Sequence, residues 1–171
     1  YGFIEIEKGI INELINHNYF QRLRRISQLG LSHLVYPGAQ HTRFQHALGC
    51  LHLASKVIQQ LEYKGHKINN EEKEALKITI LLHDIGHGPF SHALERTLVA
   101  DISHEDMTLI YMHKLNEEYN GKLSLAIKIF NNEYKKKFLH QLVSSQLDMD
   151  RLDYLKRDSF FTGVAEGNIG A

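Results

Sequence analysis

Residues 75–88 read Ala-Leu-Lys-Ile-Thr-Ile-Leu-Leu-His-Asp-Ile-Gly-His-Gly. Apolar residues recur in this stretch at spacings of three and four, which is typical of an amphipathic helix. Asn69 and Glu72 form a capping-box pattern upstream, and Gly86 and Gly88 end the pattern downstream. Adjacent helical side chains point about a quarter-turn apart, so a His-Asp pair reaches one ion most easily where the backbone loosens at a helix end. The stretch therefore predicts a helix that ends in two side chains able to bind a metal.

The rest of the chain has the same helical character. Only two Pro occur among 171 residues, and apolar residues recur mostly at spacings of three and four. The expected helices cover residues 10–29 with a break near 17–18, 44–63, 69–84, 89–99, 103–119, 123–130, 134–146 and a last segment that includes 150–158. The fold class is therefore all-α, with at most a minor β-hairpin near residues 1–6.

The overall charge gives no preference for polyanionic partners. The 20 Lys and Arg residues offset the 20 Asp and Glu residues, so we expect neither nucleic acid nor a membrane as a partner. No run approaches the roughly 18 apolar residues that a membrane span needs. The single Cys50 lies in an apolar helical stretch, which favours a buried thiol in a reducing compartment. We therefore expect a cytoplasmic protein.

Histidine is the unusual part of the composition. The chain has 12 His, and imidazole is the usual side chain for binding divalent metals and for proton transfer near neutral pH. A candidate metal set stands out: His46, His83, Asp84 and Asp150. Two imidazoles and two carboxylates suit a divalent ion such as Mn, Fe, Mg or Zn. Such an ion keeps positions for water and can polarise a phosphoryl oxygen, so hydrolysis of a phosphate ester is the first hypothesis.

Five sequence blocks add a family resemblance. They are Gln-Leu-Gly at 28–30, Tyr-Pro-Gly-Ala at 36–39, His-Thr-Arg-Phe-Gln-His-Ala-Leu-Gly at 41–49, His-Asp-Ile-Gly-His-Gly-Pro-Phe-Ser-His at 83–92, and Asp-Met-Asp-Arg-Leu-Asp-Tyr-Leu-Lys-Arg-Asp at 148–158. In this order they resemble the HD-domain metal-dependent phosphohydrolases, in particular the deoxynucleoside triphosphate (dNTP) triphosphohydrolase branch. That branch includes bacterial dGTPases and the human SAM-and-HD-domain dNTPase. The resemblance covers residues 20–165.

The resemblance carries an architecture with it. It implies that residues 1–171 form a single HD domain, the catalytic part of a longer chain. It implies a helical bundle with the metal site between central helices, and assembly into a homo-oligomer. By the same resemblance the metal ligands are His46, His83, Asp84 and Asp150, which agrees with the set chosen from residue chemistry. Asp148 competes with Asp150 for the last position, and the family motif favours the Asp directly before Arg-Leu-Asp-Tyr.

The resemblance also assigns catalytic residues. His87, His92 and His104 would lie beside the phosphates of the substrate, where an imidazole can donate a proton to the departing 5'-oxygen or hold a phosphoryl oxygen. Glu105 would orient the imidazole of His104 or favour its charged form. His41 belongs to a matched block but needs no metal role, and we expect a loop or cap contact for it. The other six His, at positions 17, 33, 52, 66, 113 and 140, are expected to be surface or packing residues.

Substrate contacts follow from the same blocks. Arg43 and Arg151 would bind phosphates, since a guanidinium can bind a phosphate through two parallel hydrogen bonds. The sugar-reading set would be Gln28, Leu29, Tyr154 and Asp158. In this set the amide and the carboxylate suit a 3'-hydroxyl, the Tyr ring can pack on deoxyribose, and the Leu side chain would crowd a 2'-hydroxyl.

The expected reaction is attack of metal-activated water on the α-phosphorus of a dNTP, which gives a deoxynucleoside and tripolyphosphate. The chain has no Gly-x-x-x-x-Gly-Lys loop, so the metal, Arg and His must hold the phosphates. Two alternatives stay open. One is a different HD reaction, by a phosphodiesterase or a nucleotidase acting on another nucleotide. The other is a non-catalytic nucleotide sensor or nucleic-acid-binding module that retains the site.

Overall fold

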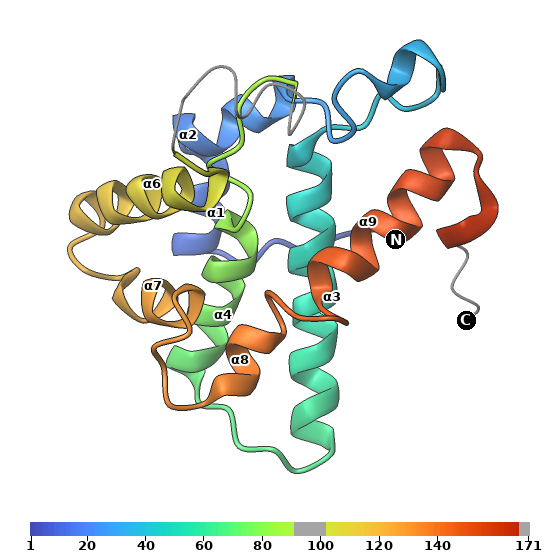
Figure 1. Ribbon diagram of the computed structural model, residues 1–171. Coiled ribbons are helices and arrows are strands. Elements are labelled where there is room, and N and C mark those ends of the chain that lie inside the picture. The colour runs from blue at the N-terminus through green and yellow to red at the C-terminus, as the bar shows by residue number, and fades with distance from the viewer. Residues whose placement is uncertain (91–101, 168–171) are drawn as a thin grey trace.

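The computed structural model describes residues 1–90 and 102–167 (Figure 1). Its helices, in chain order, are α1 (Ile10–Asn16), α2 (Asn18–Gln21), η1 (Arg22–Arg25), η2 (Ser32–Leu34), α3 (Arg43–Tyr63), α4 (Asn70–Leu82), α6 (His104–Glu118), α7 (Ser124–Phe130), α8 (Lys137–Gln141), α9 (Met149–Thr162) and η4 (Ala165–Gly167). No strand occurs in these ranges, and the only bridge there is an isolated antiparallel one between Ser27 and Thr42. The all-α expectation is confirmed for the described residues.

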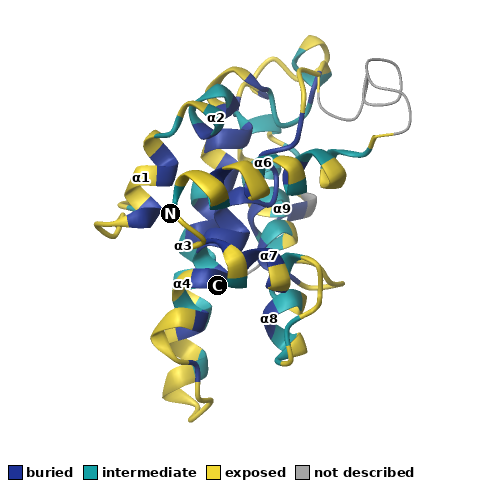
Figure 2. Cartoon of the chain, turned by 90° about the vertical axis from the view of Figure 1, so that its left-hand side faces the viewer, coloured by how far each residue is buried: buried dark blue, intermediate teal, exposed yellow. Residues whose placement is uncertain are grey.

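Helices α3 and α4 form the centre of the molecule. The 21-residue α3 packs against both α4 and α9, and α4 also packs against α7 (Figure 1). Nearly every side of α4 is covered, because Leu76, Ile78 and residues 80–82 are at most 1% exposed. A helix buried on most of its faces belongs in a core. Figure 2 shows the buried residues concentrated in the middle of the bundle, with exposed residues on the outer turns.

Two predicted helix starts have the expected caps. The side chain of Asn69 accepts a hydrogen bond from the backbone N–H of Glu72 at 2.8 Å, and Glu72 accepts one from the N–H of Asn69 at 3.0 Å. Ser103 and Asp106 form the same reciprocal pair at the start of α6. Each pair satisfies backbone donors that a helix start would otherwise leave unpaired. The sequence signals for α4 and α6 are therefore confirmed.

The hairpin expected near residues 1–6 is not formed. Residues 1–7 have no regular secondary structure, and side-chain contacts hold this segment instead. The ring of Tyr1 lies 5.2 Å from that of His52 on α3, and Glu7 forms an ion pair with Lys77 on α4. Gly2 has a positive φ angle of 74°, which interrupts an extended strand.

Two expected helices are shorter than their patterns indicated. The break at His17 is present, but the first helical region ends with η1 because the next residues pair with the segment before α3. The N–H of Gln28 donates to the carbonyl oxygen of His41, and that of Arg43 donates to Ile26. The helix expected over 134–146 is only α8, and the helix expected over 89–99 falls mostly outside the described residues. Among the described helices, none is both long and apolar enough to cross a membrane.

Candidate metal centre

The loop after α4 is held tightly on both sides. The hydroxyl of Thr108 on α6 accepts a hydrogen bond from the N–H of Gly86 at 3.0 Å and donates one to the carbonyl oxygen of His83 at 3.1 Å. A Cβ atom on Gly86 would lie 2.1 Å from a backbone oxygen of α6, so only glycine fits there. Arg22 holds the loop through two backbone carbonyl oxygens, those of Ile85 and His87. The glycine and these contacts fix where His83 and Asp84 point.

The structure brings the four predicted ligands together from three elements. Nε2 of His46, on α3, lies 3.0 Å from Oδ1 of Asp150, on α9, and 3.6 Å from Oδ2 of Asp84. Nε2 of His83, at the end of α4, lies 3.6 Å from Oδ1 of Asp150 and 3.7 Å from Oδ1 of Asp84. His46 is fully buried, and the side chain of Asp150 is the most accessible of the four at 37% exposed. Asp148 instead caps α9, where it accepts a hydrogen bond from the N–H of Arg151.

Both imidazoles use Nδ1 for a contact inside the protein. Nδ1 of His46 donates to Oδ2 of Asp153 at 2.8 Å, and Nδ1 of His83 donates to the carbonyl oxygen of Ile80 at 2.6 Å. Because these acceptors have no proton to give, Nε2 of each ring is left to bind a proton or a metal ion. Nε2 of His83 is buried and has no hydrogen-bond partner. Two imidazole nitrogens that face carboxylate oxygens fit a divalent cation, which would replace the Nε2 protons that face those carboxylates.

The charges around the centre also favour a cation. Burial raises the pKa of Asp84, but the neighbouring His83 and Arg43 outweigh burial and hold this pKa well below its usual range. Burial likewise opposes ionisation of Asp150, and the imidazoles of His46 and His83 overcome it and lower its pKa. Both carboxylates are therefore ionised at neutral pH. Their negative potential attracts a divalent cation to the facing imidazoles.

Asp153 and Arg157 support the centre, although neither was predicted as a site residue from the sequence. Asp153 is fully buried and accepts, besides the hydrogen bond from His46, two from Arg157, each 2.8 Å long. A Cβ atom on Gly49 would lie 1.8 Å from Oδ1 of Asp153, so the glycine lets α9 approach α3 closely. The spacing of Asp153 and Arg157, four apart on one helix, was a signal for their ion pair. Nothing local indicated that the pair would contact His46, which is 107 residues away.

Cys50 is a further donor near the centre. Its sulfur lies 3.5 Å from Nε2 of His46. One donor atom from each of Cys50, His46, His83 and Asp150 lies within 4.8 Å of the other three. Burial raises the pKa of this thiol to about 12. Asp84, which is outside this group of four, remains the predicted fourth ligand because its carboxylate lies 3.6 Å from Nε2 of His46 and 3.7 Å from that of His83. The expectation of a buried free thiol is confirmed.

A cleft of about 450 Å³ opens from the centre and connects it with two predicted catalytic residues. His83, Asp84 and Asp150 form one end of it, and His104 and Glu105 at the start of α6 form a side. The far wall comes from the ends of α7 and α8 and includes Phe130, Asn131, Asn132, His140 and Ser144. His140 thus lines the cleft, and its Nδ1 contacts the carbonyl oxygen of Ile129 at 3.0 Å. Its place in the cleft depends on long-range packing that no local pattern revealed.

His87 and His104 lie against each other beside the metal centre. Their rings stack with centroids 4.1 Å apart and planes 17° apart, and Nε2 of His87 is 3.4 Å from Oδ1 of Asp84. Burial lowers the pKa of His87 to about 4, so this imidazole is neutral at physiological pH. His87 can therefore form hydrogen bonds here without adding a positive charge. His92 lies outside the described residues.

Comparison with known proteins identifies the architecture. The model of the HD domain matches residues 43–158, which include all four predicted ligands. The chain belongs to the HD-domain family. A crystal structure of a phosphohydrolase from Bacteroides thetaiotaomicron superimposes on this HD domain with a TM-score of 0.96 and 62% sequence identity, over 99% of this chain and 42% of that one.

Curated relatives of this HD domain are longer proteins. The uncharacterized protein YwfO of Bacillus subtilis is 37% identical over 98% of the chain and 40% of its own length. The human deoxynucleoside triphosphate triphosphohydrolase SAMHD1 is 31% identical over 96% of the chain and 32% of its own length. The HD domain described here thus spans less than half of each of these relatives.

None of the predicted substrate contacts is among the described residues that line the 450 Å³ cleft. Arg43 is buried and its Nη1 donates a hydrogen bond to Oδ2 of Asp84. Asp158 accepts a hydrogen bond from His41, which is the kind of loop contact expected for that His. The remaining members are exposed or partly buried: Gln28, Leu29, Arg151 and Tyr154. Arg43 is thus the substrate candidate that directly contacts a predicted metal ligand in the described part of the chain.

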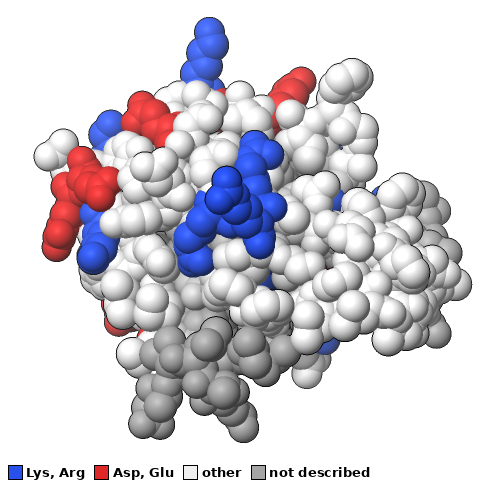
Figure 3. Space-filling view, turned by 90° about the horizontal axis from the view of Figure 1, so that it is seen from above, with Lys and Arg blue, Asp and Glu red and all other residues white. Residues whose placement is uncertain are grey.

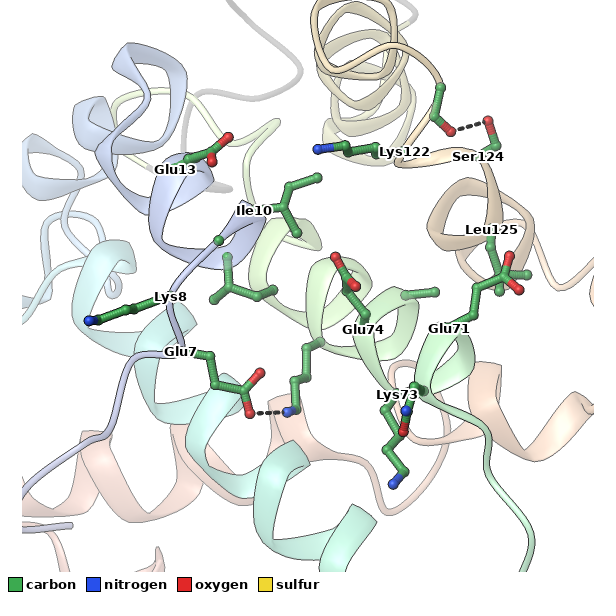
Figure 4. Close-up of a pocket in the computed structure, with 16 residues that line it drawn as sticks. Glu7, Lys8, Ile10, Glu13, Glu71, Lys73, Glu74, Lys122, Ser124 and Leu125 are labelled. Atoms are coloured by element: carbon green, nitrogen blue, oxygen red, sulfur yellow. Dashed lines mark hydrogen bonds and ion pairs between the residues drawn. The ribbon is translucent and has the colours of Figure 1, made fainter.

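A larger cavity of about 860 Å³ lies away from this centre. It is formed by the segment before α1, α1 itself, α4 and the start of α7 (Figure 4). Its described lining alternates Lys and Glu side chains and includes no His or Cys, and the ion pair of Glu7 with Lys77 lies within it. We therefore place the HD-domain chemistry in the smaller cleft. Figure 3 views the molecule from above and shows a group of Lys and Arg side chains near the middle of the visible face, with Asp and Glu side chains toward its left and upper margins.

Proposed function

We propose that this HD domain is a metal-dependent phosphohydrolase that converts a dNTP into a deoxynucleoside and tripolyphosphate. The observation that supports it most is the pair of Nε2 positions, on His46 and His83, that face the carboxylates of Asp84 and Asp150. The names of two similar proteins, the bacterial phosphohydrolase and human SAMHD1, agree with this reaction class. The choice of a dNTP rests on the sequence blocks shared with the triphosphohydrolase branch.

In this proposal His46, His83, Asp84 and Asp150 hold one divalent ion, which is Mn, Fe, Mg or Zn. When bound, such an ion acidifies a water molecule and polarises a phosphoryl oxygen. The chain supplies the rest of the chemistry around it. The cleft admits the substrate, and the buried contacts of the imidazoles keep both Nε2 atoms directed at the site.

Cationic and imidazole side chains would hold the phosphates. Arg43 brings a planar guanidinium to the edge of the metal centre, and Arg151 follows Asp150 directly on α9. His87, as a neutral imidazole, suits a hydrogen bond to a phosphoryl oxygen. We assign proton donation to the departing 5'-oxygen to His104, oriented by Glu105, or to His92.

The sugar would lie along α9. Asp150, Tyr154 and Asp158 are four residues apart in turn and share one face of that helix. Tyr154 can therefore pack on deoxyribose while Asp158 accepts a hydrogen bond from its 3'-hydroxyl. Gln28 and Leu29, in the segment that pairs with the start of α3, complete the set.

Product analysis tests the proposal. Purified protein is incubated with each dNTP and each rNTP in the presence of Mn, Mg or Fe, and the products are separated by chromatography. We expect tripolyphosphate and deoxynucleoside, no activity in His83→Ala or Asp84→Ala, and full activity in the control His66→Ala, whose side chain is exposed. Release of inorganic phosphate or pyrophosphate alone would contradict this mode of cleavage.

One observation favours a different HD reaction as the second candidate. The described lining of the cleft contains four carboxylates, those of Asp84, Glu105, Asp106 and Asp150, and no Lys or Arg. Such walls suit an uncharged organic group better than a chain of phosphates. A nucleotidase or a phosphodiesterase, whose substrate carries a single phosphate, would need fewer cationic contacts than a triphosphohydrolase. Activity on a monophosphate or a phosphodiester, with none on dNTPs, would support it, whereas tight nucleotide binding without turnover would indicate a sensor.

We also propose that this domain is the catalytic part of a longer cytoplasmic protein that forms homo-oligomers. Exposed apolar side chains support an interface, because Leu34, Val35 and Phe160 are 73, 75 and 81% exposed. Exposed apolar groups of this kind often mark protein contacts. Light scattering on the full-length protein tests the assembly, and a monomer at all concentrations would contradict it.

A further inference from the structure

His41 occupies a buried position between two members of the proposed sugar-reading set. Its side chain is fully buried, and its Nε2 lies 2.7 Å from Oδ1 of Asp158. Because an ionised carboxylate only accepts hydrogen bonds, Nε2 is the donor. The imidazole also stacks on the ring of Phe161, with centroids 4.6 Å apart and planes 23° apart. His41 is thus fixed from two sides.

The backbone of His41 contacts the second member of the set. Its carbonyl oxygen accepts a hydrogen bond from the N–H of Gln28 at 3.0 Å, next to the bridge between Ser27 and Thr42. One residue therefore holds Gln28 through its backbone and Asp158 through its side chain. The two contacted residues are 130 positions apart in the sequence.

The groups that His41 holds include acceptor atoms for which the described residues provide no hydrogen-bond donor. The side-chain oxygen Oε1 of Gln28 is buried and has no hydrogen-bond partner. Among the described residues, Asp158 makes its side-chain hydrogen bond through Oδ1, and its side chain is 24% exposed. A buried acceptor without a partner costs free energy unless a ligand or water satisfies it. This arrangement suits a ligand that presents a hydroxyl.

The end of α9 is also fixed against the loop that carries His41. A Cβ atom on Gly38 would lie 2.3 Å from the carbonyl oxygen of Phe161, so loop and helix are in close contact. The imidazole is therefore not needed to bring the two segments together. Its hydrogen bond sets the orientation of the Asp158 carboxylate.

We propose that His41 is a positioning residue for substrate selection: it holds Oδ1 of Asp158 so that the other carboxylate oxygen accepts a hydrogen bond from a sugar hydroxyl. The inference rests on the proposed function, because it assigns His41 to the substrate contacts of that reaction. His41 does not touch the reacting atoms. Its effect is on discrimination between nucleotides with and without the hydroxyl.

The test compares kcat/KM for a dNTP and for the matching 2',3'-dideoxynucleotide in full-length protein. In His41→Leu we expect a loss of about 10- to 100-fold with the dNTP, since a hydrogen bond to a charged group is involved. The dideoxynucleotide lacks the hydroxyl and should react as with wild type. His41→Gln should recover much of the loss, because its amide can donate to Asp158. His33→Leu, in the same loop region, is the matched control.

The outcomes separate a positioning role from a structural one. Equal losses with both nucleotides, or no loss with either, would overturn the inference. If His41→Leu does not fold, His41→Asn serves instead, because its amide is polar but too short to reach Asp158. If wild type hydrolyses only monophosphates, the same comparison is made with 3'-hydroxyl and 3'-deoxy monophosphates. No turnover of any nucleotide would refute both proposals, whereas turnover with an unchanged preference in His41→Leu refutes this inference alone.

Discussion

Replacing Asp153 by Asn should weaken metal binding without removing any proposed ligand. Asp153 accepts three hydrogen bonds of 2.8 Å, one from Nδ1 of His46 and two from Arg157, and is fully buried. An Asn side chain has the same shape but only one acceptor oxygen. If that oxygen faces His46, the amide NH2 opposes an Arg157 donor. If it faces Arg157, the NH2 donates to Nδ1 of His46 and leaves the ring proton on Nε2, where the metal would bind.

The expected size of this effect follows from the contact it removes. Loss of the partner of a metal-binding imidazole typically lowers metal affinity by about 10- to 100-fold. This corresponds to roughly 1.4–2.7 kcal/mol, since each tenfold change is about 1.4 kcal/mol. The loss of metal affinity in Asp153→Asn should lie at the upper end of this range. The contacts of Asp153 with His46 and Arg157 are buried, and either orientation of the amide loses at least one of them.

Isothermal titration with Mn²⁺ or Co²⁺ measures this affinity directly. Lys156→Gln, an exposed position on the same helix, is the matched control and should bind as wild type does. Thermal unfolding and circular dichroism establish that Asp153→Asn is folded. A folded Asp153→Asn protein with an affinity within about twofold of wild type, against the 10- to 100-fold loss expected, would refute the role given to this carboxylate.

Three further substitutions test the packing and charge of the fold. Gly49→Ala would place a methyl group 1.8 Å from the Asp153 carboxylate, so we expect it to destabilise the protein by about 1–3 kcal/mol in urea unfolding and to weaken metal binding. Burial raises the pKa of Glu72, but hydrogen bonds from Lys136 and other donors outweigh burial and lower this pKa from 4.5 to about 2. The ionised Glu72 therefore stabilises the fold above pH 4.5, and this stabilisation is lost as the pH falls toward 2. Unfolding measured across that pH range should show a smaller pH dependence in Glu72→Gln than in wild type. Leu76→Ala, at a fully buried site, should cost about 2–5 kcal/mol by the same assay.

The helices that could be predicted were those whose signals are local. The start of α4 at Asn69 and that of α6 at Ser103 depend on hydrogen bonds within one turn, so the sequence was sufficient for them. The end of the first helical region was not local. Residues 26–28 leave the helix because they pair with residues 41–43, and helix propensity carries no information about such a partner.

In the candidate metal centre, too, some residues could be predicted from the sequence and others could not. Residue types and spacing pointed to His46 and the His83-Asp84 pair as donors, because the chemistry of a ligand is visible in its side chain. The supporting contacts were hidden, since Asp153 meets His46 across 107 residues and His41 meets Asp158 across 117. Spacing along one helix cannot reveal which other helix a side chain will face.

One helix carries both a proposed metal ligand and a proposed hydroxyl contact. Asp150 and Asp158 are eight residues apart on α9, which is about 12 Å along the helix axis. A regular helix changes length very little, unlike two loops that could move independently. α9 would therefore hold the metal-binding carboxylate of Asp150 and the hydroxyl-binding carboxylate of Asp158 at a fixed separation. A substrate would have to place its phosphorus and its hydroxyl to suit that separation. Nucleotides that present the hydroxyl at another distance would be rejected by geometry, without any side chain that blocks them.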